Sequence, residues 1–153
     1  MSHPTIIHER VEQCRRGEYP KRIARMTSGW AVLGDSQFLK GYCLLYPDPV
    51  VADLNDFAGE TRTQFLDDMA ALGDAVLAVT GALRINYEML GNVAPALHAH
   101  VFPRYNDEPE DLRTKAVWLY PQSAWDETVF DEARDRPVME AIRRELESMG
   151  QIQ

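Results

Sequence analysis

The longest regular pattern in this sequence is an apolar stripe that repeats at helical spacing. Its members follow the positions i, i+4, i+7, i+11 and i+14: Phe65, Met69, Leu72, Val76 and Val79. Side chains at these intervals lie on one face of an α-helix, so we expect a helix over about residues 60–80. Gly81 follows directly and favours the left-handed backbone that ends many helices. This helix is the clearest element of the chain.

Shorter patterns on both sides of the long helix indicate strands and two further helices. In chain order we expect a helix over residues 5–16, strands over 22–26, 30–33 and 41–46, the long helix, strands over 83–89 and 97–102, an irregular segment over 106–135, and a helix with Pro137 in its first turn. Helices do not alternate strictly with strands, which argues against a doubly wound parallel sheet. The sequence therefore predicts an α+β fold, an antiparallel β-sheet with the long helix and the terminal helices packed on one face.

Length and charge limit the classes of function. The chain has 153 residues, of which 45% are hydrophobic and 26% charged, as expected for one globular domain over residues 1–153. The net charge of -8 makes a long nucleic acid an unsuitable partner, because such binding depends on neutralising phosphates. A small anionic ligand remains compatible, since backbone amides and a few histidines can hold it locally.

The sequence offers no membrane or secretion signal. No window approaches eighteen uninterrupted apolar residues, and the first residues lead into a charged segment. We therefore expect a cytoplasmic protein without a membrane partner. Cys14 and Cys43 lie far apart and form no Cys-x-x-Cys pair, so we expect two reduced thiols, one on a helix and one in a strand.

Two histidines occupy alternate positions at the strand expected over residues 97–102. His98 and His100 should project from one face, while Leu97, Ala99 and Val101 face the opposite layer. Both rings could simply be exposed on a solvated sheet face. Their spacing, beside a Gly-Asn loop and before Pro-Arg, favours a functional site instead.

Metal binding is an alternative use of this pair, because His-x-His on a strand can chelate zinc or copper. Such a site needs further ligands, and no cysteine, third histidine or glutamate lies near in the sequence. We expect no metal and no cofactor. A carboxylate from elsewhere in the chain keeps a metal-dependent hydrolase built on His98 and His100 as an alternative.

The segment from Asn86 to Arg104 resembles the signature of the histidine triad (HIT) family of nucleotide hydrolases and transferases. That signature is His-φ-His-φ-His-φ-φ, often followed by Pro-Arg, where φ is apolar. Residues 35–47 resemble the turn and glycine-led strand that line the nucleoside pocket of the family, and Val117-Trp118 is similar to an aromatic element downstream of the triad. The resemblance covers roughly residues 22–120 and is most specific at the histidines. It implies a HIT-like domain, with residues 106–153 as a C-terminal extension and helix.

The resemblance gives His98 the place of the nucleophile and His100 that of the third histidine. In the family, the central imidazole attacks the α-phosphorus of a nucleotide, and water hydrolyses the resulting nucleotidyl-histidine. The third histidine donates a hydrogen bond where charge develops. This implies a hydrolase or nucleotidyl transferase that cleaves a phosphoanhydride, phosphoramidate or phosphoester bond in a mono- or dinucleoside phosphate, such as a diadenosine polyphosphate.

Ala96 stands where the family carries its first histidine. We expect position 96 to orient His98 through its backbone carbonyl, which an alanine still supplies. A nucleotide-binding module with little or no turnover is the alternative that this departure leaves open.

Four further residues are candidates for substrate binding. Asn86 and Asn92 match positions that contact ribose or phosphate in similar proteins, although Asn92 is equally well explained by a turn after Gly91. Asp35 is either a ligand for the ribose hydroxyls or a turn-forming residue. Arg104 either reaches a phosphate or braces the acidic loop that follows it.

The expected partners are a small nucleotide and a second copy of the chain. The resemblance implies a homodimer with the two sheets joined edge to edge. Residues 118–120 either contribute an aromatic contact to that dimer or cover the core of their own chain.

Overall fold

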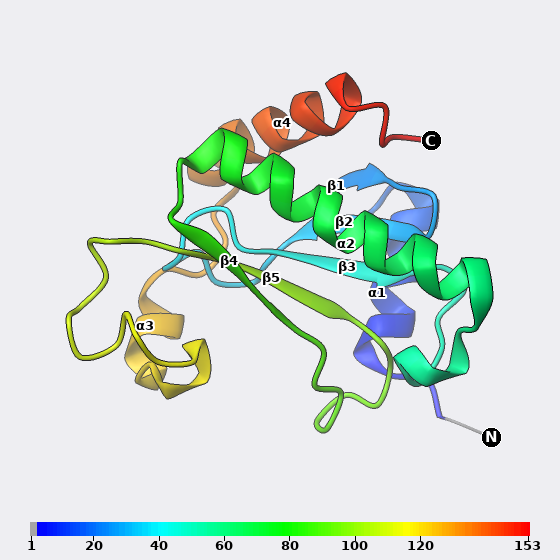
Figure 1. Ribbon diagram of the computed structural model, residues 1–153, viewed down its shortest axis with the longest axis horizontal. Helices are drawn as coiled ribbons and strands as arrows, with labels where there is room; N and C mark the ends of the chain where they lie inside the picture. The colour runs from blue at the N-terminus through cyan, green and yellow to red at the C-terminus, as the bar shows by residue number, and fades with distance from the viewer. Residues whose placement is uncertain (1–2) are drawn as a thin grey trace.

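The computed structural model describes residues 3–153 (Figure 1). Its elements are α1 (Ile6–Arg16), β1 (Arg22–Arg25), β2 (Gly29–Leu33), β3 (Cys43–Pro47), the short helix η1 (Leu54–Asp56), α2 (Gly59–Thr80), β4 (Arg84–Glu88), β5 (Ala99–Arg104), the short helix η2 (Val117–Leu119), α3 (Gln122–Glu127) and α4 (Glu132–Ser148). Met1 and Ser2, which begin the N-terminal segment considered above, lie outside the described residues. Within residues 3–153 no helix is long and apolar enough to cross a membrane.

The five strands form one antiparallel sheet in the order β1-β2-β3-β5-β4. The central strand, β3, pairs with β5 so that Leu44 lies opposite His100 and Leu45 lies opposite Ala99. The predicted α+β class with an antiparallel sheet is confirmed.

The helices cover both faces of this sheet. α2 and α4 pack against each other on the first face, over a core that includes Leu45 and Val101 (Figure 1). α1 packs on the second face, in a separate cluster that includes Leu44 and Phe102. The expectation of helices on one face only is wrong for α1. Alternate residues of β3 and β5 are apolar on both sides, so each face needs a cover.

α1 and α2 begin and end close to the predicted residues. The Thr5 side chain accepts the Ile7 N–H at 3.1 Å, and the His8 ring accepts the Thr5 N–H at 3.0 Å, which completes a capping box. Gly17 ends α1 at φ 73°, and Gly81 ends α2 at φ 66°. Both glycines adopt the left-handed conformation that favours glycine, and at Gly81 this confirms the predicted end of the long helix.

The segment over residues 106–135 contains more regular structure than expected. It includes η2, α3 and the first turn of α4. Val117 and Tyr120 are buried in it, whereas Trp118 and Leu119 are partly exposed. The expectation of an irregular segment is therefore wrong at these three elements. Of residues 118–120, Tyr120 packs against its own chain.

α4 begins at Glu132, so the placement of Pro137 in its first turn is also wrong. The Asp131 side chain accepts the Arg134 N–H at 2.8 Å and caps the helix there. Pro137 lies inside the helix and cannot donate a backbone hydrogen bond. The helix continues because its following turns bury apolar side chains: Val138, Met139, Ile142 and Leu146.

Candidate active site

A pocket of about 680 Å³ opens on the second face of the sheet. β3 and β5 form its floor, α1 borders it, and the loop over residues 90–94 and the segment over 118–129 complete its walls. The pocket contains four of the six residues that the sequence singled out: His98, His100, Asp35 and Asn92.

His98 lies directly before β5, and its Nδ1 atom is 2.7 Å from the carbonyl oxygen of Ala96. A carbonyl oxygen only accepts hydrogen bonds, so Nδ1 carries the proton and Nε2 of the neutral ring carries the lone pair. Burial and the charge of Arg10 lower the pKa of His98 and outweigh the opposing effect of the Ala96 carbonyl. The orienting contact expected from position 96 is confirmed, and it holds a neutral imidazole.

His100 lies in β5 and is buried. Its Nδ1 atom is 2.7 Å from the Tyr42 hydroxyl. The ring stacks parallel to Phe102, with a centroid separation of 5.4 Å, and meets Trp118 edge to face at 5.1 Å. Burial lowers the pKa of His100 to about 3, and the nearby His98 adds to the shift. The His100 ring is therefore neutral and confined by aromatic neighbours.

Asp35 lies at the edge of the pocket, in the turn between β2 and β3. Arg10 donates a hydrogen bond to one carboxylate oxygen at 2.7 Å, and Lys21 lies 3.0 Å from the other. Burial raises the pKa of Asp35, but hydrogen bonds and charges from Arg10 and Lys21 lower it further than burial raises it. Arg10 also donates to the Tyr46 hydroxyl at 3.0 Å. Asp35 thus anchors a cation of α1 in the pocket wall, and ribose binding by Asp35 stays a prediction.

The structure separates the other three binding candidates. Asn92 lines the pocket, in the turn that follows Gly91 at φ 71°. Arg104 and Asn86 lie together outside the pocket, with a hydrogen bond of 2.8 Å between them. Arg104 also pairs with buried Glu108 at 3.0 Å and donates to three carbonyls of the following loop. Arg104 therefore braces that loop, which is one of the two alternatives for this residue.

Sequence reasoning missed Arg10, Tyr42, Tyr46 and Trp125 as pocket residues. Trp125 stacks on Trp118 with a centroid separation of 5.2 Å and an angle of 8°. Tyr42 and Tyr46 are separated by an even number of residues, so strand periodicity places them on one face. Arg10 lies one helical turn after Ile6 and Ile7, which also line the pocket. No local pattern distinguishes Trp125.

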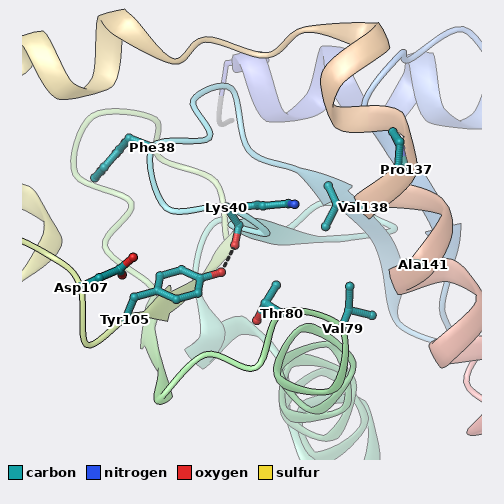
Figure 2. Close-up of a pocket in the computed structure, with 9 residues that line it drawn as sticks. All are labelled: Phe38, Lys40, Val79, Thr80, Tyr105, Asp107, Pro137, Val138 and Ala141. Atoms are coloured by element: carbon teal, nitrogen blue, oxygen red, sulfur yellow. Dashed lines mark hydrogen bonds between the residues drawn. The ribbon is translucent and has the colours of Figure 1, made fainter.

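A separate hollow of about 500 Å³ lies between the C-terminal end of α2, α4 and the loop before β3 (Figure 2). Lys40 and Asp107 lie at its border, and the Tyr105 hydroxyl donates a hydrogen bond to the Lys40 carbonyl. It contains none of the six candidate residues, so we place the candidate site in the pocket with His98.

The donor atoms for a metal are sparse in the part of the chain that the structure describes. Among residues 3–153, no three His, Cys, Asp or Glu side chains form a group that could hold a metal ion. Cys14 lies on α1 and Cys43 in β3, the kinds of element that the sequence predicts, and both thiols are free and buried. Burial raises the pKa of the Cys14 thiol to about 12 and raises that of Cys43 as well.

Comparison with known proteins identifies the fold. No family model matches the sequence, and no curated protein matches it. Among solved structures, a histidine triad protein from Marinobacter aquaeolei VT8 is similar with a TM-score of 0.72 and 19% identity, over 95% of this chain and 98% of that one. A histidine triad protein from Sinorhizobium meliloti 1021 has a TM-score of 0.69 and 19% identity, over 88% and 94% of the two chains.

A third structure, a hypothetical histidine triad nucleotide-binding protein from Sulfolobus tokodaii strain7, has a TM-score of 0.70 at 14% identity. It covers 92% of this chain and 93% of its own. These likenesses show that the chain has the fold of histidine triad proteins, as its resemblance to the family signature implies.

Proposed function

From the histidine triad fold and the geometry at His98, we propose that this protein is a nucleotide hydrolase or nucleotidyl transferase that acts through a nucleotidyl-histidine. The observation that carries the proposal is the 2.7 Å contact between His98 Nδ1 and the Ala96 carbonyl. This contact leaves the lone pair on Nε2 of a ring that lines the pocket. A neutral, oriented imidazole is what a nucleophile at phosphorus requires.

In the first step, the Nε2 lone pair attacks the α-phosphorus of the substrate. The P–N bond forms as the bond to the leaving group breaks, and the electron pair departs with the leaving atom. In the second step, the oxygen of a water molecule forms a new bond to phosphorus while the P–N bond breaks. The electron pair returns to Nε2, and the proton of the water passes to solvent.

The remaining walls of the pocket suit a nucleoside. Ile7 and Leu44 offer apolar contacts, and the stacked rings of Trp118 and Trp125 offer aromatic ones. Planar bases bind to such surfaces through stacking and burial. Asn92 adds an uncharged amide that can donate to phosphate or ribose oxygens.

The decisive experiment combines mass spectrometry of the protein with product analysis. We incubate the protein with a panel of nucleoside phosphoanhydrides, phosphoramidates and phosphoesters, quench in base, and look for a nucleotidyl mass increment on His98. His98→Ala should abolish the adduct and the turnover while nucleotide affinity stays within about threefold, because the ring contributes little to packing. His3→Ala removes an exposed histidine that does not line the pocket, and it is the control.

The two alternatives give different results in the same assay. Nucleotide binding without an adduct or product would support the binding module. Turnover that a strong chelator abolishes and zinc restores would support a metal-dependent hydrolase. Full turnover in the His98→Ala protein would exclude the nucleotidyl-histidine mechanism.

A further inference from the structure

The buried hydroxyl of Tyr42 contacts the ring of His100, and the proposed chemistry above assigns it no role. The two atoms lie 2.7 Å apart, and both side chains are buried. Among residues 3–153, this is the one side-chain hydrogen bond made by the His100 ring. The direction of this hydrogen bond therefore determines whether Nε2 of His100 carries a proton that it can donate to a ligand.

The position of the Tyr42 hydroxyl is tightly determined. The Tyr42 ring stacks on Phe102 at 4.2 Å, and its backbone carbonyl accepts hydrogen bonds from Gly34 N–H and the Gln37 side chain. A Cβ atom at Gly34 would lie 2.2 Å from the Tyr42 ring, so this arrangement requires glycine there. The ring is held by packing on both sides, and its hydroxyl has little freedom to leave His100.

The direction of this hydrogen bond follows from the chemistry of the two groups. A phenol O–H is a better donor than an imidazole N–H, and an imidazole lone pair is a better acceptor than a phenol oxygen. Tyr42 therefore donates to Nδ1 of His100, and the His100 proton lies on Nε2. The result is opposite to that at His98, where the Ala96 carbonyl forces the proton onto Nδ1.

The surroundings of His100 do not stabilise a positive charge. Phe102 stacks on the ring, Trp118 meets it edge to face, and His98 lies at a centroid distance of 4.9 Å. The Tyr42 hydroxyl faces Nδ1, and Glu88 of β4 is the cross-strand partner of His100. No carboxylate among residues 3–153 forms a hydrogen bond or ion pair with the His100 ring. A protonated ring would lose its hydration without gaining a counterion, in line with the strong lowering of its pKa.

We propose that Tyr42 is a positioning residue that holds His100 as a neutral Nε2–H donor, so that the site serves leaving groups that depart as anions. This inference rests on the proposed function for its second half. A neutral His100 donates a hydrogen bond to the leaving oxygen but does not transfer a proton to it. When His98 Nε2 bonds to phosphorus, a phosphoanhydride releases its phosphate as a stable anion with the electron pair. A phosphoramidate must instead release an amine, which needs a proton that His100 cannot supply.

The first test reads the protons directly and needs no activity. In protein labelled with ¹⁵N-histidine, the ring shifts distinguish protonated from unprotonated nitrogens. The chain has four histidines, so a His100→Gln variant assigns the signals. We expect protonated Nε2 and unprotonated Nδ1 at His100, and a mixture of tautomers in Tyr42→Phe, which keeps the packed ring. A protonated Nδ1 in the wild-type protein, or unchanged shifts in Tyr42→Phe, would overturn the positioning role.

A matched control comes from Tyr120, whose buried hydroxyl donates to Glu108 at 2.7 Å outside the pocket. Tyr120→Phe should leave the His100 shifts unchanged. In kinetics, Tyr42→Phe should lower kcat about tenfold with KM nearly unchanged, since one hydrogen bond to a transition-state donor is weakened. A roughly tenfold rise in KM alongside the fall in kcat would indicate a structural role for Tyr42 instead.

The second test compares leaving groups on the same nucleoside. We expect kcat/KM for diadenosine triphosphate to exceed that for adenosine 5′-phosphoramidate by at least about a hundredfold at pH 7. General acid catalysis, which the amine leaving group lacks here, typically raises a rate by about that factor or more. Equal values would overturn the leaving-group half. If neither compound is cleaved and no adduct forms, both the proposed function and the leaving-group preference are wrong. The ¹⁵N shifts of the His100 ring still test the positioning role of Tyr42.

Discussion

At position 96 the main chain provides the orienting contact, and the side chain is a buried alanine. An alanine there has no ring but still provides the carbonyl that contacts Nδ1 of His98 and determines its tautomer. The departure from the family signature is therefore compatible with a competent nucleophile.

Substitution at this position gives a direct test. We expect Ala96→His to change the turnover by no more than about tenfold, or about 1.4 kcal/mol in activation free energy, because the carbonyl already orients His98. Steady-state turnover and adduct formation in the two proteins provide the measurement. A wild-type protein without turnover that Ala96→His activates would contradict the enzyme proposal and favour the binding module.

The same substitution should cost stability. Ala96 has no exposed surface and belongs to the apolar cluster beneath α1. Forcing an imidazole into a packed site costs about 1–3 kcal/mol, so the free energy of unfolding in urea should fall by that amount. A variant as stable as the wild-type protein would show that the small hollow of about 220 Å³ beside Ala96 and His98 accommodates the ring.

The pair of neutral histidines also makes stability depend on pH. The pKa of His100 is lowered to about 3 and that of His98 is lowered too, so the unfolded chain takes up these protons first. The stability that these two neutral rings contribute is fully present above pH 6.5, which is about the pKa of histidine in an unfolded chain. It is lost progressively as the pH falls below that value. For buried His100 the slope reaches about 1.4 kcal/mol per pH unit.

Urea unfolding at pH 7, 6 and 5 measures this dependence in a range where most carboxylates stay ionised. We expect the wild-type protein to lose stability across this range and the His100→Gln variant to lose less. Equal slopes in the two proteins would show that His100 has the same pKa in the folded and unfolded chains, and would contradict the lowered pKa.

Among the elements, α1 contributes both to the core and to the pocket. It covers the second face of the sheet with Ile7, Val11 and Cys14, and it contributes Arg10 to the pocket wall. The stability of the first turn of α1 should therefore influence ligand binding as well as folding.

Removal of the α1 cap tests this link. Thr5→Ala loses the side-chain hydrogen bond to the Ile7 N–H and should lower the free energy of unfolding by about 1 kcal/mol. Calorimetry should also show weaker nucleotide binding. Thr63→Ala removes an exposed hydroxyl from α2 and is the control, with stability expected to change little. A loss of stability without any change in nucleotide affinity would show that the first turn of α1 does not influence ligand binding.

For the whole molecule, the two edges of the sheet differ. The outer edge of β1 is partly covered, because the Gln153 N–H donates to the Arg25 carbonyl at 2.9 Å. β4 forms the opposite edge, and within residues 3–153 no further strand pairs with it. An unpaired edge strand is a template for pairing with another chain.

We therefore expect a homodimer that joins two copies through β4. Light scattering after size exclusion should give twice the chain mass of 17.4 kDa. In hydrogen exchange, the amides of β4 that point outward should lose protection on dilution. A mass of one chain at all concentrations up to about 100 μM would contradict the dimer, since biological homodimers are generally stable there.

The amino-acid sequence by itself predicts the strands, the helices α1 and α2, and the pair of histidines at the site. Helical and strand periodicities are local properties, so the apolar stripe of α2 and the alternation around His98 and His100 can be read without a structure. The same alternation predicts that Leu97, Ala99 and Val101 face the main core, which the structure confirms.

Only the tertiary structure decides which groups distant in the chain meet. Tyr42 and His100 are 58 positions apart, and Arg10 and Asp35 are 25 apart, so both contacts depend on strand register and on the packing of α1. Arg104 shows the same dependence on folding, because the sequence left both a phosphate contact and a brace for the following loop open, and packing places its side chain against Glu108. Hydrogen bonds are short and directional, and local periodicity carries no information about partners brought together by folding.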